Sequence, residues 1–354
     1  HGQEQVLRWW EELGSDARAE LARQVGQIEW DKLSLSAEDG RRGAIAPIEG
    51  LSVAEIAARK EEYFAIGRDA VRAGKAAAVL LAGGQGTRLG SDAPKGTYDI
   101  GLTRPLYIFE QLVRNLQEVT SACGASIPLL IMTSEKNDCE TREFFEKHDC
   151  FGYPREDIFF FRQAMAPCMD LEGKILLEDK GRIALSPNGN GGWYSSLVKA
   201  GLAEAMAARG VEWYNVFAVD NVLQRICDPV FLGATIASGK ASGAKVVRKA
   251  EPHERVGVLC LEDGLPSVVE YYELSEEMAN LRGADGNLVY SFGVILNYLF
   301  RADTLKAIAD KRLPLHAAKK KISYLAPDGT FVKPETENGY KFETLILDMI
   351  RYAG

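Results

Sequence analysis

The sequence predicts an α/β protein built on a mixed, mainly parallel sheet of the Rossmann-like kind, with helices on its faces. From Lys75 onward, short β-branched or leucine-rich runs alternate with helical patterns, which is typical of parallel strands joined by helices. Before Lys75 the chain is rich in Ala, Glu, Arg and Leu, and its apolar residues recur at helical spacing. We therefore predict a helical N-terminal segment, residues 1–74, followed by an α/β domain, residues 75–354.

The elements follow in order along the chain. The helical pattern of the N-terminal segment is interrupted at residues 38–50, where Gly and Pro gather, and resumes over residues 52–74. Two further helices are expected over residues 106–119 and 195–210. Apolar runs predict strands at residues 77–83, 128–134, 213–220, 244–249 and 256–262. The last of these begins a hairpin that turns at Asp263-Gly264.

Composition excludes several classes of protein. The 354 residues carry 42 Lys and Arg against 50 Asp and Glu, a net charge of −8, which argues against non-specific binding to nucleic acid or a membrane surface. The longest apolar run, AAAVLLA, is too short to span a bilayer. Six cysteines without a C-x-x-C pair and four histidines favour neither zinc nor disulfides, so we expect a reducing cytoplasm. The oligomeric state is not indicated.

A glycine loop follows the first predicted strand. It reads VLLAGGQGTRLGSDAPKG, and its glycines allow backbone N–H groups to turn toward phosphate oxygens. The Walker spacing is missing, and the dinucleotide pattern G-x-G-x-x-G fails at Leu89. Two cations, Arg88 and Lys95, fit a triphosphate whose leaving pyrophosphate gains negative charge. A glycine-rich turn with surface cations is the alternative.

Two other segments leave alternatives open when read by themselves. Asp220 follows an apolar run, so it can hold Mg²⁺ at the sheet edge that carries the glycine loop, but Asp-Asn after a strand is equally an ordinary turn. The glycines around Asn190 precede a helical pattern, which favours a flexible turn with a helix start.

Together these segments resemble the eukaryotic-type UDP-sugar pyrophosphorylases, and are closest to the N-acetylglucosamine branch. The similarity is collinear from about Ala76 to Asp348. It rests on LAGGQGTRLG with PKG, QAMAP, PNGNGGWYSSL, AVDNVL, VGVLCLEDGLPSVVEYYEL, LPLHAAKKKISY and KPETENGYKFE. The resemblance implies a fold of the nucleotidyltransferase (GT-A-like) type.

The resemblance also implies roles for individual residues. The nucleotide would meet Leu81, Ala82, Gly83, Gly84, Gln163, Gly189 and Asn190. The catalytic cations would be Arg88, Lys95 and Lys341, the last holding the sugar phosphate. The sugar side would be formed by Asp220, Gly257 and Glu270, with Asp220 also binding Mg²⁺.

The expected reaction joins UTP and a hexose 1-phosphate into a UDP-sugar and pyrophosphate. N-acetylglucosamine 1-phosphate is the expected sugar substrate; glucose or galactose 1-phosphate is the alternative, and a non-catalytic UDP-sugar-binding protein is a further one. The sequence departs from the family at Val294, where an amide is expected, and at Leu345 and Leu347, where aromatic residues are expected. Family members continue past the position of Gly354 with another phosphate-facing lysine, and we expect that segment to be absent.

Overall fold

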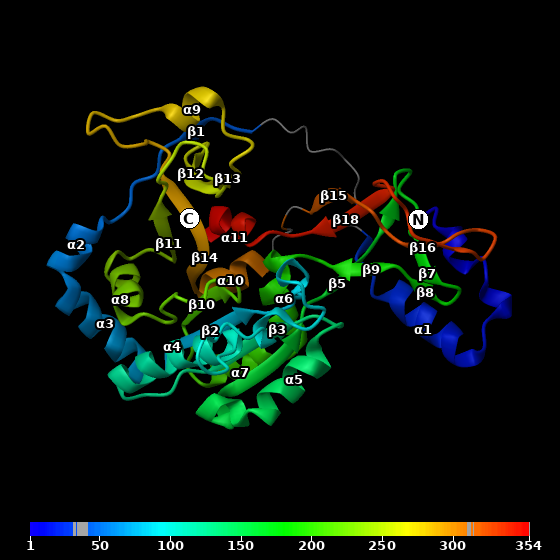
Figure 1. Cartoon of the computed structure of the whole chain (residues 1–354), viewed down its shortest axis with the longest axis horizontal. Coiled ribbons are helices and arrows are strands. Elements are labelled where there is room, and N and C mark those ends of the chain that lie inside the picture. Colours follow the sequence, from blue (N-terminus) through cyan, green and yellow to red (C-terminus); the bar gives the residue numbers. More distant parts are fainter. Residues whose placement is uncertain (31–32, 34–41, 310–312, 314, 354) are drawn as a thin grey trace. The chain divides into compact units, whose positions relative to one another are not determined.

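The computed structural model describes the chain except for residues 31–32, 34–41, 310–312, 314 and 354 (Figure 1). The chain divides into a smaller unit, residues 1–41, 163–192 and 312–348, and a larger unit, residues 42–162, 193–311 and 349–354. This division differs from the predicted boundary at residue 74. The reason is packing, since α1 (Ser15–Gly26) contacts β8 (Arg182–Ile183) in the smaller unit whereas α3 (Lys60–Arg72) packs on α8 (Pro229–Ala237) in the larger.

The described part of the larger unit is built on a nine-stranded mixed sheet. Its main path runs β1 (Ile45–Ala46), β12 (Val258–Glu262), β14 (Phe292–Arg301), β10 (Trp213–Ala218), β2 (Ala76–Leu81), β3 (Leu129–Thr133) and β4 (Ile158–Arg162). In addition, β11 (Ser242–Arg248) pairs with β14, and β13 (Leu265–Val269) pairs with β12. Strands β10, β2, β3 and β4 are parallel, and β14 joins β10 antiparallel. The predicted fold class is confirmed, and the five predicted strands are β2, β3, β10, β11 and β12.

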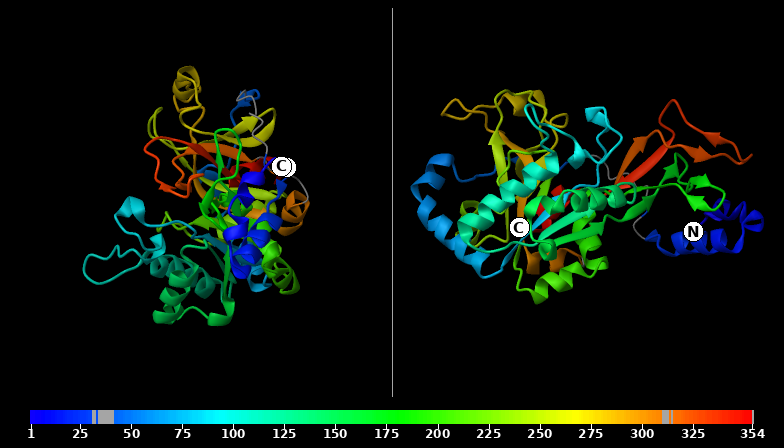
Figure 2. Two further views of the ribbon diagram at one scale, coloured as in Figure 1. Left: turned by 90° about the vertical axis from the view of Figure 1, so that its right-hand side faces the viewer. Right: turned by 60° about the horizontal axis from the view of Figure 1, so that its bottom comes forward.

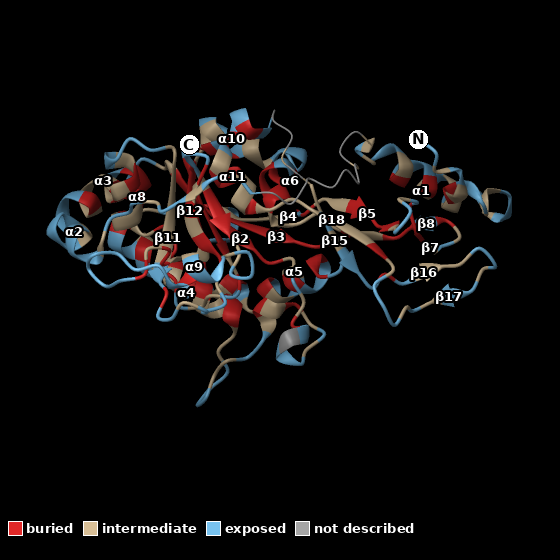
Figure 3. Cartoon of the chain, turned by 90° about the horizontal axis from the view of Figure 1, so that it is seen from above, coloured by how far each residue is buried: buried red, intermediate tan, exposed pale blue. Residues whose placement is uncertain are grey.

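Helices cover both faces of this sheet, which is why its central parallel strands β2 and β3 are buried throughout. On one face, α3, α8, α4 (Ile108–Cys123) and α5 (Asp138–Lys147) share a core with Trp213 and Phe217 of β10. Tyr214 points to the opposite face because side chains alternate along a strand, and there Trp193 of α6 (Trp193–Lys199) packs against it at a ring distance of 5.8 Å. Figure 3 shows the buried strands between these helices.

The remaining elements of the larger unit are short. They are α2 (Val53–Ala58), α7 (Leu202–Ala208), α9 (Glu276–Asn280), α10 (Ala302–Ala309), and the 3₁₀ turns η4 (Thr87–Leu89), η5 (Lys95–Thr97), η6 (Asp149–Gly152) and η7 (Arg155–Asp157). The predicted helix over 195–210 is in fact two helices, α6 and α7, because Gly201 takes a left-handed φ of 73° between them. The hairpin turn is confirmed, with positive φ at Asp263 and Gly264. Among the described helices, none has the length and apolar character needed to cross a membrane.

The smaller unit packs N-terminal helices on short strands from the middle and end of the chain. Its core joins Val6 and Leu21 to Ile183 and Phe342. The N-terminal turns are η1 (Glu4–Leu7) and η2 (Trp10–Glu12). A further turn, η8 (Asn190–Gly192), comes shortly after β9 (Leu185–Pro187). The strands are β15 (His316–Lys320), β18 (Gly339–Glu343) and β6 (Met169–Asp170), β16 (Tyr324–Leu325) with β17 (Phe331–Val332), β5 (Met165–Pro167) with β9 (Leu185–Pro187), and β7 (Leu177–Asp179) with β8. Figure 2 shows β15 beside β18. Helix α11 (Ile346–Ala353) begins in this unit and ends in the larger one.

Candidate active site

The glycine loop begins where β2 ends and folds back on itself. The N–H of Gly86 donates to the carbonyl of Ala93 at 2.9 Å, and the N–H of Lys95 donates to the carbonyl of Gly84 at 3.3 Å. A Cβ added to Gly84 would have no heavy atom within 4 Å, so the space over this residue is open to a ligand. The backward turn of the loop therefore brings Lys95 to Gly84, eleven residues earlier in the sequence.

A buried asparagine, which sequence reasoning missed, holds the start of this loop. Asn137 lies just before α5, and its amide nitrogen donates to the carbonyl of Ala82 at 2.9 Å and to that of Gly84 at 3.4 Å. Its side-chain oxygen accepts from the N–H of Ser134 at 2.7 Å. Asn137 is fully buried, so these bonds are shielded from water. The amide fixes the path of the backbone that would face a phosphate.

The residues at the carboxyl end of β2 are buried, which limits the groups that a ligand can contact there. The side chains of Leu81 and Ala82 are buried, and the carbonyl of Leu81 accepts from Val219 on the neighbouring chain segment at 3.3 Å. The N–H of Ala82 donates to the carbonyl of Met132 at 2.8 Å. Gly83 and Gly84 are more accessible. A nucleotide would therefore meet mainly the glycine backbone.

The position of Lys95 is fixed by the glycine that follows it. Gly96 is buried in η5 against α4, and a Cβ added to it would lie 2.2 Å from the ring of Phe109. Only a residue without a side chain allows the backbone to come this close. The glycine of the PKG motif thus lets the backbone at Lys95 lie close to α4, the helix that follows the loop.

Asp220 lies at the same sheet edge as the glycine loop, as the sequence predicted. Strands β2 and β10 are parallel neighbours, with Ala218 opposite Leu81, so the segments that follow them leave the sheet together. The Nζ of Lys95 forms an ion pair with Oδ1 of Asp220. The lysine side chain is 18 % exposed and the aspartate side chain 64 % exposed. A cation and an accessible carboxylate therefore stand together beside the glycines.

Two of the three residues predicted for the sugar, Gly257 and Glu270, also lie together in the larger unit. A Cβ added to Gly257 would lie 3.4 Å from Oε1 of Glu270 and 3.4 Å from Cγ2 of Val294. The N–H of Val294 donates to the carbonyl of Gly257 at 2.9 Å. Burial raises the pKa of the Glu270 carboxyl and the charge of Glu273 raises it further, whereas Arg42 lowers it. Val294 thus places an apolar side chain beside Gly257 and the partly desolvated carboxyl group of Glu270.

The predicted uridine residues lie together in the smaller unit. Strands β5 and β9 pair with Met165 opposite Pro187, and the N–H of Asn188 donates to the carbonyl of Ala164 at 3.0 Å, so Gln163 and Gly189 each lie one residue beyond this contact. Gly189 has a φ of 87°, and a Cβ on it would lie 2.3 Å from the carbonyl oxygen of Thr344, so this position requires glycine.

The other predicted residues of the smaller unit have structural surroundings of their own. The side-chain oxygen of Asn190 accepts from the N–H of Ile346 at 3.0 Å, at the start of α11. Lys341 lies on β18 opposite Ala318 and is half-buried. In the larger unit, the backbone of Arg88 lies in η4, and its side chain falls outside the described part of the structure.

The fold and this site define a nucleotidyltransferase. The parallel edge of a mixed sheet carries a loop of backbone amides, a seated lysine and an accessible carboxylate, and these groups can hold and neutralise a polyphosphate. Comparison with known proteins gives the particular family. Residues 19–345 match the model of the UTP–glucose-1-phosphate uridylyltransferase family, and the chain belongs to that family. It is an enzyme of the UDP-sugar pyrophosphorylase class.

Individual relatives agree with this assignment. Human UDP-N-acetylhexosamine pyrophosphorylase-like protein 1 is 38 % identical over 99 % of this chain and 75 % of its own length. The UDP-N-acetylglucosamine pyrophosphorylase of Saccharomyces cerevisiae is 37 % identical, over 98 % and 78 %. The crystal structure of the Trypanosoma brucei UDP-N-acetylglucosamine pyrophosphorylase with an inhibitor is similar with a TM-score of 0.84 at 30 % identity, over 99 % of this chain and 73 % of that one. A UDP-glucose phosphorylase from the same organism shares the fold, with a TM-score of 0.70 at 19 % identity over 96 % and 73 %.

Proposed function

We propose that the chain transfers the uridylyl group of UTP to N-acetylglucosamine 1-phosphate and releases pyrophosphate. The observation that carries the proposal is the position of Lys95. Its backbone is held against the glycine loop, and its side chain pairs with Asp220 where the parallel strands end. The choice of sugar is supported by relatives named for N-acetylglucosamine or N-acetylhexosamine at 37–38 % identity.

Catalysis in this proposal rests on position and charge. An oxygen of the sugar phosphate, already anionic near neutral pH, attacks the α-phosphorus of UTP in line; a P–O bond forms to the sugar phosphate as the bond to pyrophosphate breaks. No general base is required, because the nucleophile carries its charge before the reaction. Lys95 and Arg88 stabilise the departing pyrophosphate, and Lys341 holds the incoming phosphate.

Gln163, Gly189 and Asn190 are assigned to the uridine. The amide of Gln163 offers both a donor and an acceptor, which matches the edge of uracil. Gln163 shortly precedes β5 and Gly189 shortly follows β9, and these two strands pair antiparallel, so the two residues can serve one base. Asn190 follows directly, and its side-chain oxygen is already used at the start of α11.

Magnesium fits the donors at the proposed site. Mg²⁺ is usually held by one or two carboxylates together with substrate phosphates, where it neutralises charge on the phosphate oxygens. Asp220 is such a carboxylate and is accessible. In the described residues no group of three or more His, Cys, Asp or Glu side chains could hold a metal ion without a substrate. Asp220 would therefore bind the metal jointly with UTP.

We also propose that the enzyme works in a reducing compartment, the cytoplasm. All six cysteines are free thiols, and five of them are buried. Burial raises the pKa of Cys260 to about 11, so this thiol stays protonated and unreactive at neutral pH.

The test measures pyrophosphate release from UTP and Mg²⁺ with N-acetylglucosamine, glucose and galactose 1-phosphates in parallel. The proposal expects the N-acetylglucosamine compound to have the highest kcat/KM. Replacing Lys95 or Arg88 by Ala should lower kcat by about 10² to 10³. The matched control is Lys245→Ala, which also breaks a lysine–aspartate pair, with Asp228 at 2.9 Å, but not at the glycine loop.

Three outcomes would contradict the proposal. A preference for glucose or galactose 1-phosphate would reassign the sugar, and Val294, which cannot hydrogen-bond a hydroxyl group, would be the first residue to examine. UDP-sugar binding without pyrophosphate release from any of the three would identify a binding protein. Equal rates for Lys95→Ala and Lys245→Ala would remove Lys95 from the mechanism.

A further inference from the structure

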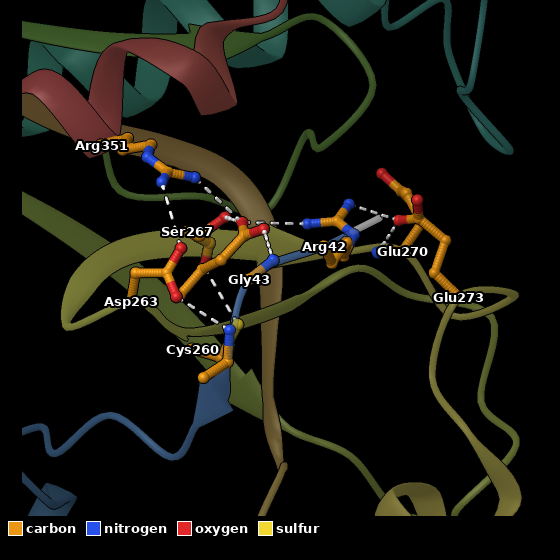
Figure 4. A network of polar contacts seen from close by, with 10 residues as sticks. Arg42, Gly43, Cys260, Asp263, Ser267, Glu270, Glu273 and Arg351 are labelled. Atoms are coloured by element: carbon orange, nitrogen blue, oxygen red, sulfur yellow. Dashed lines mark hydrogen bonds and ion pairs between the residues drawn. The ribbon is translucent and has the colours of Figure 1, made fainter. Parts of the chain in front are cut away.

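We propose that Arg42 is a positioning residue for Glu270, acting through Glu273, and that it keeps Glu270 ready to accept hydrogen bonds from the sugar. The inference rests on the proposed function, which assigns Glu270 to the sugar hydroxyl groups. Arg42 lies far from Glu270 in sequence and belongs to no motif. The structure brings it into one polar network with the hairpin of β12 and β13 (Figure 4).

The guanidinium group of Arg42 spans two carboxylates. Its Nη2 lies 2.5 Å from Oε2 of Glu273, and its Nη1 lies 3.3 Å from Oε2 of Glu262. The planar fork of arginine suits such a bridge, which the single ammonium of lysine cannot reproduce. Arg42 thereby ties the segment after β13 to the end of β12.

Glu273 in turn holds the backbone of Glu270. The N–H of Glu270 donates to Oε2 of Glu273 at 3.0 Å, and the N–H of Glu273 donates to the carbonyl of Glu270 at 2.9 Å. The turn of residues 270–273 is thus closed at both ends. The oxygen of Glu273 that accepts from Glu270 is the same oxygen that Arg42 contacts.

The other side of the bridge is firmly anchored. The side chain of Glu262 is 9 % exposed, and it accepts from the hydroxyl of Ser267 at 2.8 Å and from the N–H of Gly43 at 3.0 Å. Arg351 reaches the same carboxylate at 3.2 Å from α11. Burial alone would raise the pKa of Glu262, but these partners outweigh it and hold the pKa below its ordinary value. Arg42 is therefore attached to a fixed, charged group.

The charges around Glu270 give the bridge a second effect. Burial and Glu273 favour the protonated form of Glu270, and Arg42 opposes them. The other titratable groups that feel Glu270 are the phenols of Tyr272 and Tyr298, whose pKa values are raised by burial and then by Glu270, so they stay neutral. Without Arg42, the negative charge of Glu273 acts unopposed. Glu270 then takes up its proton at higher pH and loses acceptor capacity.

The experiment measures KM for N-acetylglucosamine 1-phosphate in Arg42→Ala between pH 6 and 8.5. We expect KM at pH 6 to rise over the parent by at most about fivefold and at pH 8.5 by less than about twofold, because a screened charge near a partly buried carboxyl is worth about 1 kcal/mol. KM for UTP should stay within about twofold. The sugar phosphate titrates in the same way in every assay, so its effect cancels when the KM of a variant is divided by the KM of the parent at the same pH.

Three variants separate positioning from a general structural effect. Arg351→Ala removes a cation from the same Glu262 but leaves Glu273 untouched, and it should not change the pH dependence. Glu273→Gln keeps an oxygen for the N–H of Glu270 and removes the charge, so adding Arg42→Ala to it should raise KM at pH 6 by a smaller factor than Arg42→Ala does in the parent. Arg42→Lys should restore the low-pH KM in part.

A measurement without turnover keeps this inference separate from the proposed function. The Glu270 carboxyl is titrated by carbon-13 NMR, with Glu270→Gln for assignment. Arg42→Ala should raise its pKa and Arg351→Ala should not. An unchanged titration in Arg42→Ala, or an equal shift in both variants, overturns the proposal, whereas absence of turnover in the parent chain overturns only the proposed function.

Discussion

Replacing Asn137 by Ala tests whether one buried amide supports the glycine loop. In the folded chain this side chain donates to the carbonyl of Ala82 and accepts from the N–H of Ser134. Alanine leaves both of those backbone groups unpaired, and both residues are almost fully buried. The change therefore combines a stability effect with a loosened loop.

The size of the stability effect follows from the two unpaired groups. Each buried donor or acceptor left without a partner costs about 1 to 3 kcal/mol, and a water molecule that enters the vacated space recovers part of this. We expect a loss of about 2 to 4 kcal/mol in the free energy of unfolding. Because the amide holds the backbone near Gly84, KM for UTP should rise by about tenfold, the factor that corresponds to about 1.4 kcal/mol.

The assays are urea unfolding followed by circular dichroism, and the UTP dependence of pyrophosphate release. Thr141→Val is the matched control one turn later in α5, since Thr141 is fully buried and its hydroxyl has no partner in the described structure. Removing that hydroxyl should be neutral or stabilise by up to about 1 kcal/mol. If Asn137→Ala unfolds at the same urea concentration as Thr141→Val and keeps the parent KM for UTP, the amide does not support the loop.

Three further predictions concern single positions. Gly96→Ala places a methyl group against Phe109, so it should lower the free energy of unfolding by about 1 to 3 kcal/mol and also lower kcat. Thermal unfolding and pyrophosphate release measure the two effects, and parent-like values of both would contradict this prediction. Gly189→Ala meets both a left-handed φ and the carbonyl of Thr344, so we expect a loss of at least about 1 kcal/mol in urea unfolding; an unchanged midpoint would contradict the assigned backbone. Burial raises the pKa of the Asp138 carboxyl, but hydrogen bonds from neighbouring side chains outweigh it and lower the pKa. The stability that Asp138 contributes is therefore present above its ordinary pKa of 3.8 and lost as the pH falls through the lowered value. Asp138→Asn should thus flatten the acid side of a stability profile, and an unchanged profile would refute this.

The sequence was sufficient where a local pattern determines the outcome. Strand ends of parallel neighbours meet at one edge, so the glycine loop and Asp220 were expected together, and the pairing of Leu81 with Ala218 confirms this. The turn at Asp263-Gly264 could likewise be predicted, because a turn with two successive left-handed residues favours Asp followed by Gly. These are short-range rules, and they hold without knowledge of the rest of the fold.

The rest depends on contacts that no local pattern encodes. Asn137 is one amide in a polar stretch, and its role appears only when β3 and α5 carry it under the loop. The long run FGVILNYLFR could have predicted β14, but its central place next to β10 depends on long-range pairing. The two cations of the glycine motif gave no hint that one of them, Lys95, would pair with Asp220. The division into units was also invisible, since it reflects which distant segments pack together.

The interleaved make-up of the smaller unit has a consequence for how the chain matures on the ribosome. Val6 is synthesised long before Phe342, yet both belong to one apolar cluster. The parallel strands β2, β3 and β4, by contrast, follow each other closely and can pair while translation continues. The elements around Val6 and Leu21 must therefore wait, with their apolar face uncovered, until Phe342 has been made, and during that interval the nascent chain is exposed to aggregation.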